Sequence, residues 1–252
     1  MLMATADPDW TIDLAAPIEP QVHRILRERI IRNDLRPDQR ISEAEIASFY
    51  GVSRQPVREA FIRLAAEGLV AVLPQRGTMV RRIGLSGVLD ARFLREAFEA
   101  DIVRLLAREP ARVDLAGLRG HIARQRRAAE RDALGFMRSD QDFHRALAAA
   151  AGKDGIWPQV EGLTAHMDRV RFLSIGALKT RRLVDQHARI VELIAAGDET
   201  GAEAAVREHL RELLKDLPQI IGTHPDFFDA PLDGAEDRVV VIKSSGSVTP
   251  SE

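Results

Sequence analysis

Residues 41–82 read ISEAEIASFYGVSRQPVREAFIRLAAEGLVAVLPQRGTMVRR, and this stretch decides the fold of the first part of the chain. Ser42 and Glu45 have the spacing of a capping box, which predicts that a short amphipathic helix begins here. Gly51 supplies a tight turn, and Ser53 predicts the cap of a second helix. Two helices joined by a short turn are typical of a helix-turn-helix, whose second helix enters the major groove of DNA.

The second helix of this stretch has an apolar side and a basic side. Pro56 falls in its first turn, where a missing N–H is tolerated. Four apolar residues recur at helical spacing and predict the buried side: Val57, Ala60, Phe61 and Leu64. Arg54, Gln55 and Arg58 lie together on the opposite side near the beginning of the helix, where a recognition helix keeps its base and phosphate contacts.

Two Val-rich runs, Leu69–Leu73 and Thr78–Ile83, follow this helix and predict a β-hairpin. Arg76 would lie at its tip, and Gly77 would let the backbone approach a phosphate or enter the minor groove. From Ser53 to Ile83 there are six Arg and two Glu, a local charge of +4 in a chain whose net charge is −2. The overall charge therefore hides a basic surface.

Length and composition indicate a globular protein with one large domain or two ordinary ones. Of the 252 residues, 45% are hydrophobic and 29% are charged, which is typical of a soluble protein. There are no cysteines, and this excludes disulfides and thiolate metal sites. No apolar run approaches the roughly 18 residues that span a membrane, and the N-terminus lacks the pattern of a signal peptide. We therefore expect a cytoplasmic protein without a membrane partner.

Patterning in the first third of the chain predicts three segments. Residues 1–15 form a flexible lead, which Trp10 would help to hold against the domain that follows. Residues 16–83 form a winged helix-turn-helix domain, whose first helix spans Pro20 to Asn33. Residues 84–87, with a glycine at each end, are the expected linker.

Residues 88–222 read as helix after helix, and the short connections between them favour antiparallel neighbours. The six expected helices are Val88–Arg108, Asp114–Asp132, Ala133–Ala150, Ile156–Leu173, Leu178–Ala196 and Thr200–Gly222. Residues 223–252 form a tail that either packs on the bundle or a partner subunit or is disordered at its end. The predicted fold class is mainly α, with an N-terminal winged helix-turn-helix and a C-terminal antiparallel all-helical bundle.

Four polar residues lie on apolar stripes of the expected bundle helices: Asp140, His144, His187 and His209. Asp140 and His144 are four residues apart and share a helix face. Because an unpaired polar group is costly to bury, we expect the four side chains to meet. One carboxylate and three imidazoles suit zinc first, and nickel or manganese as alternatives. The other interpretation is a set of hydrogen-bonded core histidines.

Residues 20–83 resemble the winged-helix head of GntR-type transcription regulators, and GVSRQPVREA at 51–60 is the most specific piece. The resemblance implies that Arg54 and Arg58 contact the operator, that Arg76 and Gly77 form the wing tip, and that Arg40 touches the DNA backbone. Gln55 stands where Thr is commoner in the family, which leaves the base preference there open. The alternative is that these arginines form a solvated helix face.

Residues 88–217 resemble the FCD-type effector domain of the FadR-like branch of this family. Its metal-binding members carry an Asp-x-x-x-His pair and two later histidines, which match the four polar residues above. The resemblance implies an effector-binding arginine, here Arg95, with Arg169 and Arg171 as further candidates. An arginine fork beside a metal suits a small carboxylate or a sugar acid. The alternative for Arg95 is an ion pair with Glu99 on the next turn.

These observations predict a ligand-responsive transcription regulator rather than an enzyme, and the resemblance implies a repressor, although the sequence itself leaves the sign of regulation open. A homodimer would read an inverted-repeat operator in double-stranded DNA. One alternative is a metal-dependent enzyme with an accessory DNA-binding head. Another is a nucleoid-type protein whose DNA binding ignores sequence and ligands.

Overall fold

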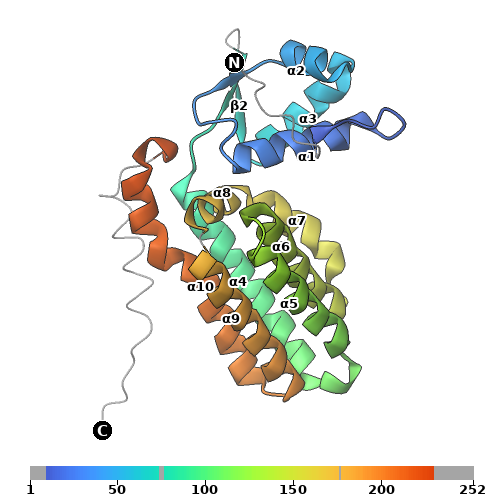
Figure 1. Cartoon of the computed structure of the whole chain (residues 1–252), viewed down its shortest axis with the longest axis vertical. Coiled ribbons are helices and arrows are strands. Elements are labelled where there is room, and N and C mark those ends of the chain that lie inside the picture. The colour runs from blue at the N-terminus through green and yellow to red at the C-terminus, as the bar shows by residue number, and fades with distance from the viewer. Residues whose placement is uncertain (1–9, 74–76, 176, 230–252) are drawn as a thin grey trace.

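The computed structural model describes residues 10–73, 77–175 and 177–229. It has a small N-terminal head above a long helical bundle (Figure 1). The elements of the head are α1 (Ile18–Ile31), β1 (Arg40–Ile41), α2 (Glu43–Tyr50), α3 (Arg54–Ala66), β2 (Val70–Leu73) and β3 (Gly77–Val80). Those of the bundle are α4 (Leu85–Arg108), α5 (Leu115–Ala129), α6 (Ala133–Ala150), α7 (Trp157–Leu163), α8 (Ala165–Ser174), α9 (Ala177–Ala195) and α10 (Glu199–Thr223). The predicted fold class is confirmed.

The head forms around the helix-turn-helix in the way the sequence predicts. Gly51 ends α2 in the left-handed conformation, with φ of 64°, a conformation that glycine adopts without a steric penalty. Ser42 and Ser53 occupy the N-cap positions of α2 and α3, but neither side chain makes a capping hydrogen bond. The predicted capping hydrogen bonds were therefore wrong, although both helices begin directly after these serines.

The sheet of the head has three antiparallel strands in the order β1-β3-β2, one strand more than the predicted hairpin. Arg40 pairs with Met79 and Ile41 with Thr78, so the short β1 covers the free edge of β3. Residues 74–76 at the wing tip lie outside the described residues, and Arg76 is one of them. Trp10 is buried with its ring against the guanidinium groups of Arg29 and Arg32, each about 5.0 Å from the ring centroid.

Three bundle helices, α5, α6 and α10, begin with the same side-chain capping hydrogen bond. Asp114, Asp132 and Asp198 are N-cap residues, and each carboxylate accepts a hydrogen bond from the backbone N–H three residues later. That third residue is a glycine in every case. Such caps satisfy backbone donors that the first turn of a helix leaves free, which explains the predicted starts of α5, α6 and α10.

The bounds of several bundle helices differ from the prediction by one to three residues, and two differences change the expected elements. The helix expected at Ile156–Leu173 is divided at Thr164 into α7 and α8. The helix α4 begins at Leu85, so residues 85–87 belong to it and only Gly84 remains of the expected linker. Among the described residues, no helix is both long and apolar enough to cross a membrane.

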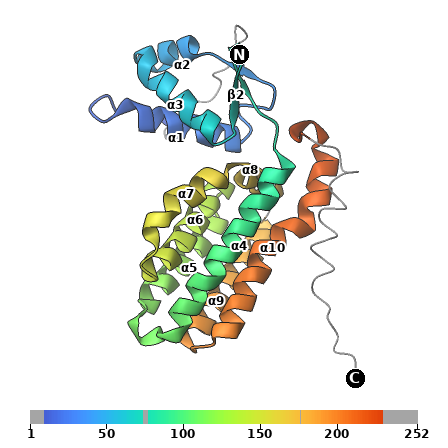
Figure 2. The same ribbon diagram turned by 180° about the vertical axis from the view of Figure 1, so that it is seen from behind.

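The end of α10 returns to the junction between head and bundle, on the side seen in Figure 2. The backbone N–H of Ile83 donates to the carbonyl of Phe227 (2.7 Å), and Asp229 donates back to Ile83 (3.2 Å). The carboxylate of Asp229 also accepts a hydrogen bond from Leu85 at the start of α4. Residues 224–229 of the predicted tail therefore pack at the junction, and residues 230–252 lie outside the described residues.

Candidate metal centre and nucleic-acid interface

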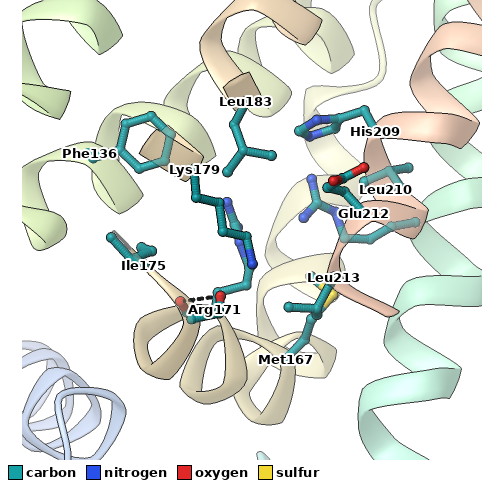
Figure 3. Close-up of a pocket in the computed structure, with 12 residues that line it drawn as sticks. Phe136, Met167, Arg171, Ile175, Lys179, Leu183, His209, Leu210, Glu212 and Leu213 are labelled. Carbon is teal, nitrogen blue, oxygen red and sulfur yellow. Dashed lines mark hydrogen bonds between the residues drawn. The ribbon is translucent and has the colours of Figure 1, made fainter. Parts of the chain in front are cut away.

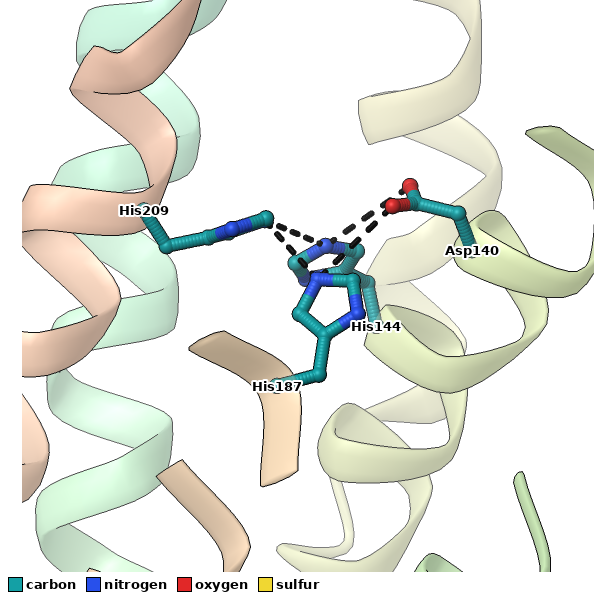
Figure 4. Close-up of side chains that lie close together, drawn as sticks. All are labelled: Asp140, His144, His187 and His209. Carbon is teal, nitrogen blue, oxygen red and sulfur yellow. Dashed lines mark hydrogen bonds and ion pairs between the residues drawn. The ribbon is translucent and has the colours of Figure 1, made fainter. Parts of the chain in front are cut away.

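Asp140 and His144 of α6, His187 of α9 and His209 of α10 point toward one another inside the bundle (Figure 4). One ligand atom from each lies within 4.8 Å of the others, and all four residues are buried. The prediction that the four side chains meet is confirmed. The apolar stripes that carry them bring the three helices together, so the polar atoms converge because the core packs.

Each imidazole ring uses its Nδ1 atom to contact a side-chain oxygen. The pairs are His144 with Glu99 (2.5 Å), His187 with Gln125 (2.8 Å) and His209 with Gln186 (3.1 Å). Because Gln125 donates its amide nitrogen to the carbonyl of Ser139, its oxygen faces His187. An oxygen acceptor places the proton of a neutral ring on Nδ1. All three Nε2 atoms then turn their lone pairs toward the centre of the cluster.

The Nε2 atoms are close enough to share one cation. His209 Nε2 lies 2.9 Å from His187 Nε2 and 3.2 Å from His144 Nε2. Asp140 oxygens lie 3.8 Å and 3.7 Å from the Nε2 atoms of His144 and His187. Metal–nitrogen bonds of about 2.0–2.1 Å place neighbouring ligand atoms roughly 3 Å apart, which matches this spread. The residues present therefore fit a divalent metal ion.

The protonation of the cluster also suits a cation. Burial lowers the pKa of His187 to about 3 and holds the pKa of His209 well below its usual value. Burial alone would raise the pKa of Asp140, but the nearby Arg171 and the imidazoles outweigh it and lower that pKa. Asp140 Oδ1 is buried and accepts no hydrogen bond within the described part of the chain. An ionised carboxylate beside neutral imidazoles is the form that binds metal.

A small cavity of about 40 Å³ adjoins the cluster (Figure 3). It is lined by Arg95, Phe136, Met167, Arg171, Ser174, Ile175, Lys179, Leu183, His209, Leu210, Glu212 and Leu213. Arg171 donates to Asp140, and Lys179 forms an ion pair with Asp216. The cavity thus joins positive side chains to an apolar wall beside His209.

The three predicted effector arginines have different surroundings. Arg95 lines the cavity and also makes the ion pair that was its alternative, with its Nε 2.6 Å from Glu99 Oε1. Arg171 lines the cavity as well. Arg169 lies away from it, fully buried, and donates to the carbonyl of Arg81 (2.6 Å). Burial lowers the pKa of Arg169 to about 10. Its placement indicates a role at the junction of head and bundle.

Sequence reasoning missed the glutamines that orient the rings, and two cavity residues, Lys179 and Glu212. Gln125 was detectable in principle, because it continues the buried side of α5 after Leu118 and Ile122. A polar residue on an apolar stripe is the signal that identified the histidines. Gln186 and Lys179 are recognisable only once α9 is placed against its neighbours.

Those predicted DNA-contacting residues that the structure describes are exposed on the head. Arg54, Gln55 and Arg58 project from the beginning of α3, and Gln55 donates to Glu59 one turn later (2.9 Å). Within the described residues, Arg54, Arg58 and the exposed Arg40 of β1 form no ion pair. Such cations remain available for phosphate or base contacts at a helix N-terminus. Gly77 is exposed at the start of β3, with φ of 83°.

Comparisons with known proteins agree with both parts of the chain. Residues 19–80 match the family described as bacterial regulatory proteins, gntR family, and residues 90–212 match the FCD domain. The HTH-type transcriptional repressor RspR of Escherichia coli is 35% identical over 214 residues, which cover 84% of this chain and 94% of RspR. The HTH-type transcriptional repressor GlaR of the same organism is 30% identical, over 75% of this chain and 90% of GlaR.

Solved structures show the same fold. E. coli McbR/YncC matches with a TM-score of 0.67 at 21% identity, and the match covers 80% of this chain and 97% of the McbR/YncC chain. A putative GntR regulator from Rhodococcus has a TM-score of 0.65 at 27% identity, over 81% and 97% of the two chains. The chain therefore belongs to the GntR family of bacterial transcription regulators, with a GntR-type DNA-binding head and an FCD domain.

Proposed function

We propose that this chain is a repressor whose binding to operator DNA responds to a small carboxylate held beside a divalent metal ion. The observation that carries the proposal is the convergence of three Nε2 atoms and the Asp140 carboxylate next to a positively lined cavity. Such a repressor works where the DNA is, so we expect it in the cytoplasm.

Asp140, His144, His187 and His209 would hold the metal, and zinc is the first candidate for one carboxylate and three imidazoles. Nickel and manganese accept the same nitrogen and oxygen ligands. A bound cation would supply a positive charge that attracts a carboxylate oxygen of the effector.

Arg95, Arg171 and Lys179 would bind the effector from the cavity side. An arginine fork suits a carboxylate because it can donate two parallel hydrogen bonds. A volume of about 40 Å³ holds about three water-sized groups, since one such group needs roughly 10–15 Å³. The cavity therefore favours a short carboxylic acid, and a sugar acid would need the cavity to widen.

DNA recognition would come from the head. Arg54, Gln55 and Arg58 would enter the major groove, Arg76 and Gly77 would form the tip of the wing, and Arg40 would touch the backbone. A homodimer would present two heads to an inverted repeat, because a two-fold protein matches a two-fold operator.

The test begins with native mass spectrometry of the full chain purified without chelator, which records subunit number and bound metal. Operator fragments are then selected from random double-stranded DNA, and binding is measured by fluorescence anisotropy with a panel of short carboxylic acids. His187→Ala should keep DNA binding but lose the response to the acid. A response to the acid that persists in His187→Ala would contradict the metal-centred mechanism.

A further inference from the structure

Asp168 of α8 joins the bundle to the head. Its side chain is only 1% exposed, and its Oδ2 atom accepts hydrogen bonds from Arg27 of α1 (3.0 Å) and Gln141 of α6 (3.2 Å). Gln141 is the neighbour of Asp140 in the sequence. Asp168 Oδ1 is buried and accepts no hydrogen bond from any described residue. One carboxylate therefore holds the head through one oxygen and leaves the other unsatisfied.

Arg171 lies one turn after Asp168 and likewise has one side-chain atom without a hydrogen-bond partner among the described residues. Its Nη2 donates to Asp140, while its buried Nη1 makes no hydrogen bond within the described residues. That Nη1 lies 4.0 Å from Asp168 Oδ1. Leaving two such groups unpaired is costly, and a small movement of the guanidinium would satisfy both. Arg171 thus stands between the carboxylate of the metal cluster and the carboxylate that holds the head.

The contact continues from Arg27 to the recognition helix. Arg27 Nε lies 3.0 Å from Glu67 Oε2, and Glu67 is the C-cap residue directly after α3. Glu67 also pairs with His23 of α1 (2.6 Å). Apart from the 4.0 Å step between Arg171 and Asp168, these ion pairs run from Asp140 to the end of the helix that carries Arg54 and Arg58.

We propose that Arg171 exchanges its ion pair between Asp140 and Asp168. This exchange couples metal binding in the cluster to how tightly the head is held. With a cation bound, Asp140 attracts Arg171 less strongly, because its charge is shared and the cation repels the guanidinium. Arg171 then closes on Asp168, which divides its charge between Arg171 and Arg27. The head is held less tightly at α1. This inference rests on the proposed metal site.

The experiment is hydrogen–deuterium exchange of the full chain, treated with chelator and then measured with and without Zn²⁺ alone. In the wild type, we expect zinc to speed exchange in α1 and around Glu67 by about fivefold to 150-fold, the range of typical coupling between two sites. Isothermal titration calorimetry records zinc binding for each variant in parallel.

Three variants decide whether Asp168 carries the effect. Asp168→Asn and Arg27→Gln should bind zinc yet show no zinc-dependent change in α1, because each breaks the contact with the head. Arg138→Gln is the matched control. Arg138 pairs with Glu28 (2.5 Å), which also joins the bundle to α1 but does not involve Asp168. This control should keep the zinc response.

The outcomes separate this inference from the proposed function. A wild type that binds zinc without a change in α1, or an Asp168→Asn variant that responds like the wild type, overturns the exchange and leaves the metal site standing. A wild type that takes up no zinc overturns both. If Asp168→Asn does not fold, Arg27→Gln decides, since that residue is partly exposed.

Discussion

Replacing Gln125 by Leu should weaken metal binding without removing any ligand. Gln125 is fully buried, and its oxygen accepts the hydrogen bond that keeps the proton of His187 on Nδ1. Leu has a similar size and no acceptor. In the variant, the proton of His187 can move to Nε2, the atom that would bind the metal.

The size of the effect follows from this single contact. Removing the hydrogen-bond partner of a metal-binding histidine typically lowers metal affinity by about tenfold to a hundredfold. We therefore expect a loss of that size, equal to roughly 1.4–2.7 kcal/mol of binding free energy. The apo protein should also lose about 1–3 kcal/mol of unfolding free energy, because the buried Nδ1 of His187 is left without a hydrogen-bond partner.

A competition titration against a zinc-binding dye at pH 7.5 measures this affinity. Gln125→Glu is the control, since it keeps an acceptor for His187 and should bind zinc at least as tightly as the wild type. Circular dichroism shows whether both variants are folded. A folded Gln125→Leu variant with wild-type zinc affinity would refute the assignment of the His187 proton to Nδ1.

Three further predictions concern the head and its junction with the bundle. Arg58→Ala should lower operator affinity by about 1–3 kcal/mol while zinc binding stays unchanged, as measured by anisotropy and calorimetry, and Arg124→Ala on α5 should change neither. Burial, and to a smaller extent the charges of nearby arginines, lowers the pKa of His166 from 6.5 to about 4. Between these pH values His166 is therefore neutral in the folded chain but protonated in the unfolded chain. The unfolding free energy should therefore fall by up to about 3 kcal/mol between pH 6.5 and pH 4, and denaturant titrations should show a smaller fall in His166→Asn. Gly68→Ala should lower the unfolding free energy by about 1–3 kcal/mol, because φ is +74° there and the added Cβ would lie 3.1 Å from His166 Nε2; an unchanged melting temperature would contradict this.

The sequence was most informative where structure depends on near neighbours. The helical pattern of residues 88–222 located α6 at its observed bounds, Ala133–Ala150. The same periodicity put Asp140, His144, His187 and His209 on buried faces, and the cost of burying polar groups predicted that they would meet.

Features that depend on distant partners were not predictable in this way. The strand β1 has two residues and exists because Arg40 and Ile41 pair with β3, nearly 40 positions away. The only local signal for the break at Thr164 is Gly162, two residues earlier, and a single glycine inside a helical pattern does not by itself end a helix. Arg169 lies between His144 and His187 in the sequence, but its burial against Arg81 follows from how head and bundle pack.

The hydrogen bonds of Ile83 with Phe227 and Asp229 also bear on how the protein is made. A chain emerges from the ribosome from its N-terminus, and early domains fold first. The head is complete after β3, whereas the contacts of Ile83 and Leu85 with residues 227–229 form only after α10 has been synthesised. A nascent chain can therefore hold a folded head before it holds a finished junction, and the last stretch of synthesis completes the joint between the two.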